Sequence, residues 1–374
     1  MPRILHTADW QIGRQYSRFS PDDAAILADA RFSTIEHIAA LASQEQVDAV
    51  LVAGDVFDAQ TVSDRTIHRL FHALQGYAGP WILIPGNHDA ALAESVWSRA
   101  ERLSAIPANA HVFLQPDIRE FADLGLAVLG APLTQRQTYQ DLTEWFDTAE
   151  TTPGLLRIGL AHGSVQGLLA EDIDSSNPIA ADRAHRGRLD YLALGDWHGL
   201  KQVDEHTWYS GTPEQDRFRN NGAGQVLLVD LPGAGQAPIV QPHPMSQYRW
   251  DSWAESLAVA SDVELLIQRL NQLPSVAVLD LTISGHIDLA DEHRLQQALS
   301  ATQGRCRSLQ YDLTELRLIP SDDDIAALQA DGYVGDVIAD LQNRQQGDDA
   351  QTARDALVIL SGLLRKRAHP EAQA

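Results

Sequence analysis

Cysteine and lysine are nearly missing from this chain of 374 residues, which has one cysteine, Cys306, and two lysines, Lys201 and Lys366. A single cysteine excludes a disulfide within the chain. No apolar run approaches the ~20 residues that a helix needs to span a bilayer, and the run after the N-terminal methionine is too short for a secretory signal peptide. These absences predict a cytoplasmic protein that does not span a membrane.

Positive charge is scarce as well, because 28 Lys and Arg residues stand against 51 Asp and Glu residues, for a net charge of −23. Domains that bind nucleic acid are usually basic, so this balance weighs against a nucleic-acid substrate. Metal ions would neutralise any carboxylates that bind them, and a partner protein can supply phosphate contacts of its own. The positive charge that exists is almost all arginine, which favours bidentate contacts with phosphate.

An alternation of strands and helices is expected over residues 1–90. Ser20 and Pro21 mark the start of a helix that runs to about residue 42, with Ile26, Ala30, Ile35 and Ile38 on its apolar face. A second helix is predicted over residues 63–76. This order indicates parallel strands joined by right-handed crossovers. The strands come closer together beyond residue 110, and predict a second sheet built from residues 111–114, 126–129, 155–160, 191–194, 207–209 and 225–231.

Five short polar blocks follow apolar runs and dominate the functional signal. They are residues 9–11 (DWQ), 54–58 (GDVFD), 86–89 (GNHD), 161–163 (AHG) and 195–198 (GDWH). Each run before a block has the β-branched and aliphatic composition of a strand buried on both faces. Because ligands gather at the carboxyl ends of strands in such sheets, the blocks should converge. Carboxylate, amide and imidazole groups without thiolates suit a divalent metal site, and their number suits two ions.

A single Asp after a strand is more often a helix cap or a turn residue than a ligand, so no block is diagnostic alone. An isolated histidine such as His6 is expected to be a surface or a satisfied core residue. Surface charge is likewise the simpler reading for the basic residues near the blocks, although each could contact phosphate: Arg14, Arg18, Lys201, Arg217 and Arg219.

The order of the blocks resembles the calcineurin-like metallophosphoesterases, whose usual series is D-x-H, G-D, G-N-H, H and G-H-x-H. The sequences HTADW at residues 6–10, GDVFD at 54–58, YLALG at 191–195 and YSGTP at 209–213 are most similar to the SbcD-type branch, the nuclease subunit that works with an SMC-like ATPase in DNA repair. The resemblance covers residues 1–230 well and the rest only in layout. It implies a four-layer α/β-β/α sandwich with metals at one edge, a small α/β capping domain and C-terminal helices.

The same resemblance implies roles for individual residues. Asp55 would bridge two metal ions. Asp9, Gln11 and His198 would complete the first site, and Asn87, His162 and Asp196 the second. His88 would face the substrate as the catalytic residue, where it could stabilise charge or protonate the leaving oxygen.

Three positions depart from the family series. Gln11 stands in place of the histidine of D-x-H, and Asp196 in place of the first histidine of G-H-x-H. Oxygen ligands in place of nitrogen favour Mn²⁺, or else Mg²⁺, over Zn²⁺ or Fe²⁺. Asp58 stands where the nuclease branch often has histidine, which removes an imidazole from the phosphate side. The changes also leave room for an inactive relic, against which the retention of Asn87, His88, His162 and His198 argues.

The rest of the chain is predicted to form smaller units. A strand at residues 276–283, a helix at 289–299 and an extended segment at 306–318 are similar in layout to the capping domain, which follows an exit from the first domain at 242–244. Helices are expected at 325–328, 334–341 and 353–364, interrupted at 345–349. The predicted divisions are 1–245 for the nuclease domain, 246–320 for the capping domain and 321–374 for a helical segment that binds a partner.

Three functions remain open from the sequence. The first is a Mn²⁺-dependent DNA exonuclease, with single-strand endonuclease activity, that acts with an SMC-like ATPase of the SbcC type; the resemblance also implies a homodimer. The second is a phosphodiesterase or phosphatase for a small molecule or nucleotide. The third is a scaffold without activity whose helices bind a partner. The extra module and helices favour the first function, and the acidic charge favours the second.

Overall fold

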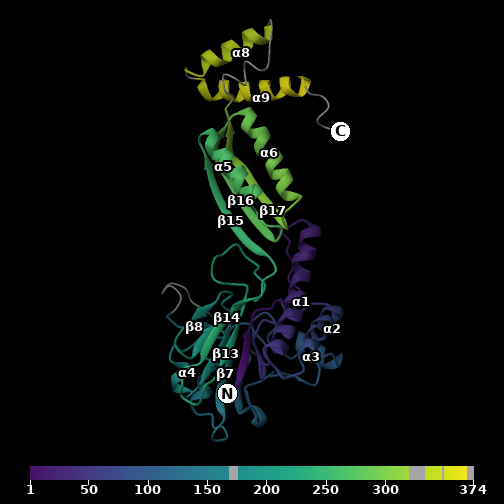
Figure 1. The fold of residues 1–374 in the computed structure, drawn as a ribbon, viewed down its shortest axis with the longest axis vertical. Helices are drawn as coiled ribbons and strands as arrows, with labels where there is room; N and C mark the ends of the chain where they lie inside the picture. The colour runs from purple at the N-terminus through teal and green to yellow at the C-terminus, as the bar shows by residue number, and fades with distance from the viewer. Residues whose placement is uncertain (168–175, 320–332, 348, 369–374) are drawn as a thin grey trace. The chain divides into compact units, whose positions relative to one another are not determined.

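The computed structural model describes residues 1–167, 176–319, 333–347 and 349–368. The chain divides into two compact units, Met1–Arg249 and Trp250–Ala374 (Figure 1). The finer division at residues 245 and 320 stays a prediction.

Unit 1 contains two six-stranded sheets. The first consists, in order, of β14 (Ile239–Pro244), β13 (Gln225–Asp230), β1 (Arg3–Thr7), β2 (Ala49–Ala53), β3 (Trp81–Ile84) and β4 (Ala110–Val112). The second consists, in order, of β11 (Lys201–Gln202), β12 (Thr207–Tyr209), β10 (Tyr191–Gly195), β7 (Leu156–His162), β6 (Leu126–Ala131) and β5 (Asp117–Phe121). Within each sheet the strands that precede the polar blocks run parallel to one another, β1 to β2 to β3 and β7 to β10. A short pair, β8 (Ser164–Val165) and β9 (Pro178–Ile179), lies beside the second sheet.

Alternating side chains of β2 show why the unit has four layers. Val50 and Val52 belong to the core between the first sheet and its helices, whereas Leu51 packs with Ile158 and Tyr191 of the second sheet. The helices on the first sheet are α1 (Pro21–Gln44), α2 (Asp64–Ala73) and α3 (Val96–Arg102). The outer face of the second sheet is covered by α4 (Arg183–Arg186) and neighbouring turns. Strands buried on both faces need the near-continuous apolar runs that the sequence has, and the predicted four-layer sandwich is confirmed.

The helix starts follow the local sequence signals. The Ser20 hydroxyl accepts a hydrogen bond from the Asp23 N–H at 3.2 Å, with Pro21 in the first helical position. The Ser63 hydroxyl caps α2 in the same way, through the Thr66 N–H at 3.1 Å. The prediction that Ile26 belongs to the apolar face of α1 is wrong, because Ile26 is 37% exposed.

Three sheet assignments from the sequence need correction. The strands predicted at 111–114 and 225–231 belong to the first sheet, as β4 and β13, and not to the second. Residues 242–244 do not leave the domain but end β14, which pairs with β13. Strand β14 is an edge strand, where the missing N–H groups of Pro242 and Pro244 cost no ladder bond.

Unit 2 contains the three-stranded sheet β15 (Arg249–Leu257), β16 (Ala277–Ile287) and β17 (Ser308–Leu318), with helices α5 (Ala260–Asn271) and α6 (Leu289–Gln303). Both helices lie on one face of the sheet (Figure 1). Leu266 of α5, Leu295 of α6 and Leu281 of β16 share one buried core. The predicted strand–helix–strand order is present, and β15 and α5 are elements that the sequence reading missed.

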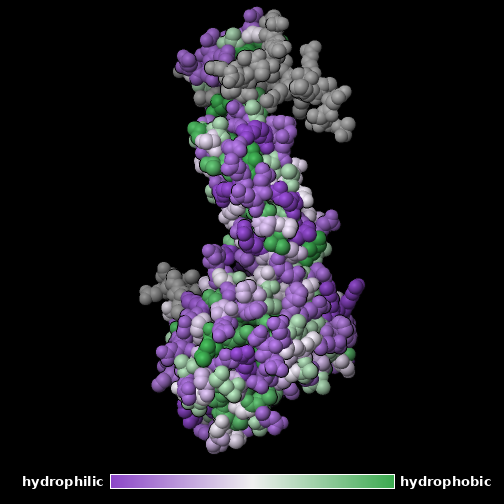
Figure 2. All heavy atoms as spheres, viewed as in Figure 1, coloured by the Kyte–Doolittle hydropathy of each residue, from purple (hydrophilic) through white to green (hydrophobic). Residues whose placement is uncertain are grey.

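Two C-terminal helices complete unit 2, α8 (Tyr333–Arg344) and α9 (Ala350–Ala368), with the predicted break between them. Ile338 and Leu357 are buried, 4% and 0% exposed. The segment predicted at 325–328 lies outside the described residues, as does the side chain of Leu364. No helix among the described residues is long and apolar enough to cross a membrane. Hydrophilic and hydrophobic side chains are interspersed on the face drawn in Figure 2.

Candidate metal centre

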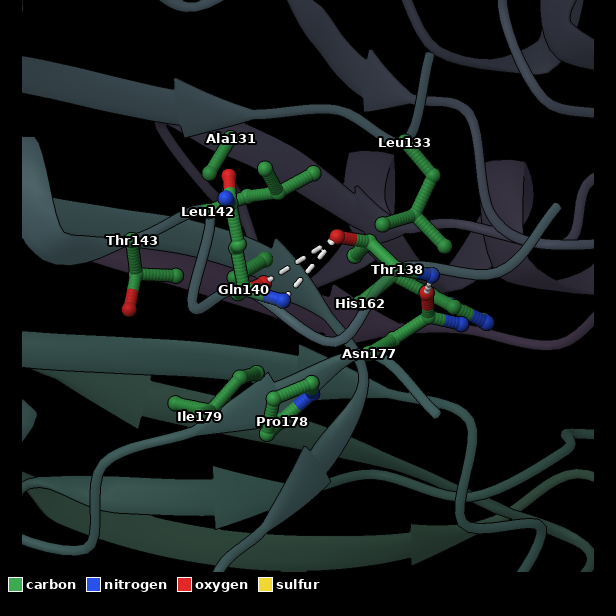
Figure 3. A pocket seen from close by; sticks show the side chains of 11 residues that line it. Ala131, Leu133, Thr138, Gln140, Leu142, Thr143, His162, Asn177, Pro178 and Ile179 are labelled. Carbon is green, nitrogen blue, oxygen red and sulfur yellow. Dashed lines mark hydrogen bonds between the residues drawn. The ribbon is translucent and has the colours of Figure 1, made fainter. Parts of the chain in front are cut away.

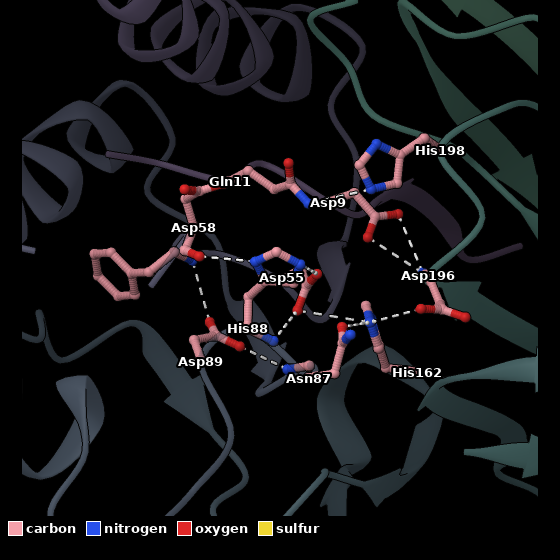
Figure 4. A network of polar contacts seen from close by, with 12 residues as sticks. Asp9, Gln11, Asp55, Asp58, Asn87, His88, Asp89, His162, Asp196 and His198 are labelled. Atoms are coloured by element: carbon pink, nitrogen blue, oxygen red, sulfur yellow. Dashed lines mark hydrogen bonds and ion pairs between the residues drawn. The ribbon is translucent and has the colours of Figure 1, made fainter. Parts of the chain in front are cut away.

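The five polar blocks converge where strands of both sheets end (Figure 4). Asp9 follows β1, Asp55 follows β2, and Asn87 with His88 follows β3. His162 is the last residue of β7, and Asp196 and His198 follow β10. Carboxylate or imidazole atoms of Asp9, Asp55 and His162 lie within 4.8 Å of one another, and all three residues are buried.

Four of the predicted ligands have left-handed backbone conformations, with φ of 53° at Asp9, 44° at Gln11, 51° at Asp55 and 97° at Asp196. Non-glycine residues in sparsely populated regions cost of order 1–3 kcal/mol each and cluster at functional sites. Hydrogen bonds between the loops hold these conformations: the Asp9 N–H donates to the Gly54 carbonyl at 3.0 Å, and the Gln11 N–H to the Asp55 carbonyl at 2.8 Å. Strain gathered on these four residues indicates a site built for side-chain placement.

Close packing explains two glycines of the blocks. A Cβ on Gly54 would lie 2.3 Å from His162 Nδ1, and Gly54 has a φ of +88°. A Cβ on Gly86 would lie 2.2 Å from Asp55 Oδ1. Only glycine lets the loops approach His162 and Asp55 so closely.

The predicted second site collects lone pairs around one point. The His162 Nδ1–H donates to the Ala53 carbonyl at 2.8 Å, which leaves Nε2 as the acceptor when the ring is neutral. The side-chain oxygen position of Asn87 is 3.1 Å from His162 Nε2 and 3.1 Å from each carboxylate oxygen of Asp55. Asp196 Oδ1 lies 3.8 Å from the same Nε2. A proton on His162 Nε2, a turned Asn87 amide or a cation can satisfy these atoms, and the mixture of carboxylate, amide and imidazole groups fits a divalent ion.

The pKa values of the residues in this cluster reflect both their burial and the negative charge around them. Burial raises the pKa of Asp9 to about 6, against the opposing pull of His198 and His162. Burial alone lowers the pKa of His162, but the carboxylates of Asp55, Asp9 and Asp196 outweigh it and raise the pKa to about 9. A metal ion that binds here replaces these protons.

The predicted first site is arranged differently, because both ends of the buried Gln11 amide are engaged. Its oxygen accepts from Arg14 Nη1 at 2.5 Å, and its nitrogen lies 3.1 Å from His198 Nε2. His198 Nδ1 is 3.5 Å from the carboxylate of Asp216. Since the amide nitrogen only donates and the carboxylate only accepts, His198 carries its proton on Nδ1 and accepts from Gln11 through Nε2. The residues are together as predicted, but Gln11 does not direct its oxygen to a common point with Asp9 and Asp55.

His88 lies beside the cluster without joining it. Its Nδ1–H donates to the Asp58 carbonyl at 2.7 Å, and its Nε2 is 3.9 Å from Asp55 Oδ2. The backbone N–H of His88 donates to Asp55 Oδ1 at 2.9 Å. With 39% of its side chain exposed, His88 presents Nε2 where a substrate could reach it.

Two buried carboxylates support the site and were missed as functional residues by the sequence reading. Asp89 accepts hydrogen bonds from the Gly86 N–H at 2.7 Å and from the Val56 and Phe57 N–H groups at 3.0 and 3.2 Å. It therefore ties the Asn87 loop to the Asp55 loop, and its place in the GNHD block was a usable signal. Burial and the Asp55 charge raise the pKa of Asp89 to about 7, while its backbone donors act in the opposite direction.

Asp216 is the second buried carboxylate that supports the site. Burial favours its neutral form, but His198, Arg31 and Arg14 outweigh burial and hold the pKa of Asp216 well below its usual range. Nothing in the local sequence distinguishes this residue, since it meets His198 only through the fold. Carboxylates that orient a histidine in this way are usual behind metal sites.

The basic residues near the blocks differ in placement. Arg14 contacts Gln11 and forms ion pairs with Asp58 at 3.5 Å and with Asp216 at 3.4 Å. Arg18 stacks over Phe218, and the Lys201 ammonium lies 5.3 Å from the Trp197 ring centre. Arg14 thus contacts a predicted ligand, Gln11. His6 is a satisfied core residue, bonded to the Tyr191 hydroxyl and the Leu194 carbonyl.

A small cavity of about 10 Å³ lies behind His162 (Figure 3). Its wall includes Thr138 and Asn177, which exchange hydrogen bonds: the Thr138 N–H donates to the Asn177 side chain at 2.9 Å, and the Asn177 N–H to the Thr138 carbonyl at 2.7 Å. A space of this size holds about one water molecule, so it does not suit a substrate. The hydrogen bonds between Thr138 and Asn177 hold the chain in place behind His162.

Comparison with known proteins agrees with this geometry. The sequence profile of the calcineurin-like phosphoesterases matches residues 2–287. The chain belongs to this family. The resemblance inferred from the five blocks is thereby confirmed.

Some relatives are named as nucleases or as DNA repair proteins. The SbcD component of the nuclease SbcCD from Rhodobacter capsulatus is 44% identical over 96 residues, which are 24% of this chain and 22% of the relative. The corresponding SbcD component from Bacillus subtilis is 24% identical over 341 residues, 79% of this chain and 83% of the relative. The DNA double-strand break repair protein Mre11 of Aeropyrum pernix is 28% identical over 263 residues, 64% of this chain and 60% of the relative. The chain thus covers less than two thirds of the Rhodobacter and Aeropyrum proteins.

Proposed function

We propose that this protein is a divalent-metal-dependent DNA nuclease, an exonuclease that also cuts single strands internally and acts in DNA repair in the cytoplasm with an SMC-like ATPase. The observation that carries the proposal is the convergence of Asp55, Asn87, His162 and Asp196 on one point with their acceptor atoms facing one another. Two relatives are named as nucleases and one as a DNA double-strand break repair protein, and together these names support DNA as the substrate. Mn²⁺ is the ion that we propose, with Mg²⁺ as the alternative, because Asp196 contributes oxygen where the family series has nitrogen.

The chemistry assigned to the chain follows from the contacts. A bound divalent cation polarises a phosphodiester and lowers the pKa of a water molecule. Asp55, Asn87, His162 and Asp196 would hold the cation, and Asp89 would keep the loops of Asp55 and Asn87 in register. His88, fixed through Nδ1, would place Nε2 against the phosphate or the leaving oxygen.

Hydrolysis by the full chain tests the proposal directly. With Mn²⁺ we expect cleavage of bis-p-nitrophenyl phosphate and of single-stranded DNA, and complete loss of both activities with chelator, restored by added Mn²⁺. Mg²⁺, Co²⁺ and Ni²⁺ should be tested in parallel, with and without the ATPase. No cleavage of either substrate under any of these conditions would overturn the proposal.

A small-molecule phosphodiesterase or phosphatase is the second candidate, favoured by the net charge of −23. The same assay separates the two. A DNA nuclease cleaves an oligonucleotide with a rate that falls as salt rises, since phosphate contacts are screened. An enzyme for small substrates would cleave bis-p-nitrophenyl phosphate or nucleotides and leave DNA intact.

We further propose that helices α8 and α9 bind the ATPase. Ile338 and Leu357 are buried, so part of the apolar surface predicted for this segment is covered. Ile359 and Leu363, four residues apart on α9, remain 64% and 61% exposed. Side chains at this spacing lie on one helix face, and an apolar helix face is a common docking surface.

Substitution of this pair provides the test. Ile359→Glu with Leu363→Glu should abolish co-purification with a co-expressed SMC-like ATPase of the SbcC type, while cleavage of bis-p-nitrophenyl phosphate stays at the wild-type rate. The exposed polar pair Gln351→Glu with Asp355→Asn on α9 is the matched control and should still bind. Undiminished binding by the Glu variant would show that α9 is not the docking face.

A further inference from the structure

The loop that carries Gln11 and Arg14 contains a feature that the family resemblance does not account for. Gln11 is fully buried, and Arg14 Nη1 donates to its amide oxygen. The amide nitrogen faces His198 Nε2 at 3.1 Å. Two atoms that a metal ion would need at the first site, the oxygen of Gln11 and Nε2 of His198, are therefore already bound by hydrogen bonds within the protein.

Arg14 also fixes the direction of the amide. A guanidinium has donors and no acceptor, so a Gln11 side chain turned through 180° would direct its NH₂ group at other donors. Arg14 is itself held by ion pairs with Asp58 at 3.5 Å and with Asp216 at 3.4 Å, and by the hydrogen bond from its backbone N–H to the Gln11 carbonyl at 3.1 Å. The turn and the ion pairs leave the amide one favourable orientation.

Asp216 reinforces the arrangement from the far side. It lies 3.5 Å from His198 Nδ1 and 3.3 Å from Arg31 Nη2, and Arg31 is only 2% exposed. His198 is thus oriented with its Nε2 toward Gln11. A divalent ion placed between Gln11 and His198 would also lie beside the positive charge of Arg14, which disfavours it by like-charge repulsion.

The second site offers the opposite situation. Atoms of Asn87, His162 and Asp55 approach to between 3.1 and 3.6 Å, and the hydrogens that can satisfy them, a proton on His162 Nε2 or those of a turned Asn87 amide, give way when a cation binds. A cation there replaces a proton and relieves repulsion among carboxylates, whereas a cation at the first site must break the hydrogen bonds of Gln11 and lie beside the charge of Arg14. The first and second sites therefore differ in the free energy that an ion would gain on binding.

We infer that Arg14 and Gln11 close the first site to metal and that this chain works with one tightly bound divalent ion, held by Asp55, Asn87, His162 and Asp196. The Arg14 guanidinium supplies the positive charge on the side where the family series predicts the other ion. This inference rests on the proposed function only through the second site. Family membership alone predicts two ions.

Titration of the full chain with Mn²⁺ tests the inference without a substrate. Calorimetry should give one tight site per chain, with any second site weaker by ~10-fold or more, and electron paramagnetic resonance should show the spectrum of an isolated Mn²⁺ ion at one and at two equivalents. Arg14→Met, which removes the donor and keeps the chain length, should bind a second ion and give the spectrum of a coupled pair. Arg18→Met, on the same loop, is the matched control and should keep one site.

Gln11→His is the second variant, since it restores the imidazole that the family series has at this position, and it should also gain the second ion. Two ions bound with equal affinity by the wild-type chain would overturn the inference. So would one ion in both Arg14→Met and Gln11→His. A chain that binds one Mn²⁺ as described and cleaves no phosphodiester would instead contradict the proposed function and leave the inference standing.

Discussion

Asp55→Ala is expected to lose metal binding and hydrolysis together. Asp55 contributes both carboxylate oxygens to the cluster, 3.1 Å from the Asn87 oxygen position and 3.6 Å from His162 Nε2. Loss of one charge-stabilising group commonly costs ~10²–10³ in rate, and loss of the ion itself should cost at least as much. We expect a fall in kcat of ~10³-fold or more on both DNA and bis-p-nitrophenyl phosphate, with no tight Mn²⁺ site by calorimetry.

The fold should survive this substitution. Asp9, Asp55 and Asp196 place three carboxylates near His162, and removal of one relieves repulsion among the carboxylates, which offsets the lost attraction between Asp55 and His162. The midpoint of thermal unfolding in chelator should therefore not fall for Asp55→Ala. Asp117→Ala, at an exposed position of β5, is the control and should keep metal and activity. Retention of a tight Mn²⁺ site by Asp55→Ala would remove Asp55 from the centre.

Much of unit 1 could be predicted because its signals are local. Ser20 and Ser63 cap helices through atoms three residues away, and a strand buried on both faces has to be apolar along its whole length. Sheet membership could not be predicted in the same way. Strand β4 is followed by chain that enters the second sheet, but it pairs with β3, and β13 returns to β1. Those pairings depend on contacts across long sequence separations.

The metal centre could likewise be predicted only in part. Residue types at strand ends predicted which side chains would meet, and the structure brings Asp9, Asp55 and His162 together. The direction of the Gln11 amide was not predictable, because it is set by Arg14, whose own position depends on Asp216 more than 200 residues later. Asp216 had no recognisable motif around it. Composition and spacing thus identify candidate ligands, and only the fold shows which atoms of those ligands remain free to bind.

His88→Ala is expected to separate chemistry from metal binding. No atom of the His88 ring is needed for the cluster of Asp55, Asn87 and His162, and Nε2 lies 3.9 Å from Asp55 Oδ2. Mn²⁺ affinity should therefore stay within about twofold of wild type, while DNA cleavage falls ~10²-fold or more, as expected when a proton donor or charge stabiliser is lost. His185→Ala, at an exposed position of α4, is the matched control and should keep both properties.

The choice of substrate shows which role His88 has. The leaving oxygen of DNA is a strongly basic alkoxide that needs a proton, whereas p-nitrophenolate leaves without one. A proton donor at Nε2 predicts that His88→Ala loses far more activity on DNA than on bis-p-nitrophenyl phosphate, and a charge stabiliser predicts equal losses on both. Because the Nδ1–H donates to the Asp58 carbonyl, the ring can deliver a proton only from Nε2. Wild-type rates on both substrates would mean that His88 takes no part in the reaction.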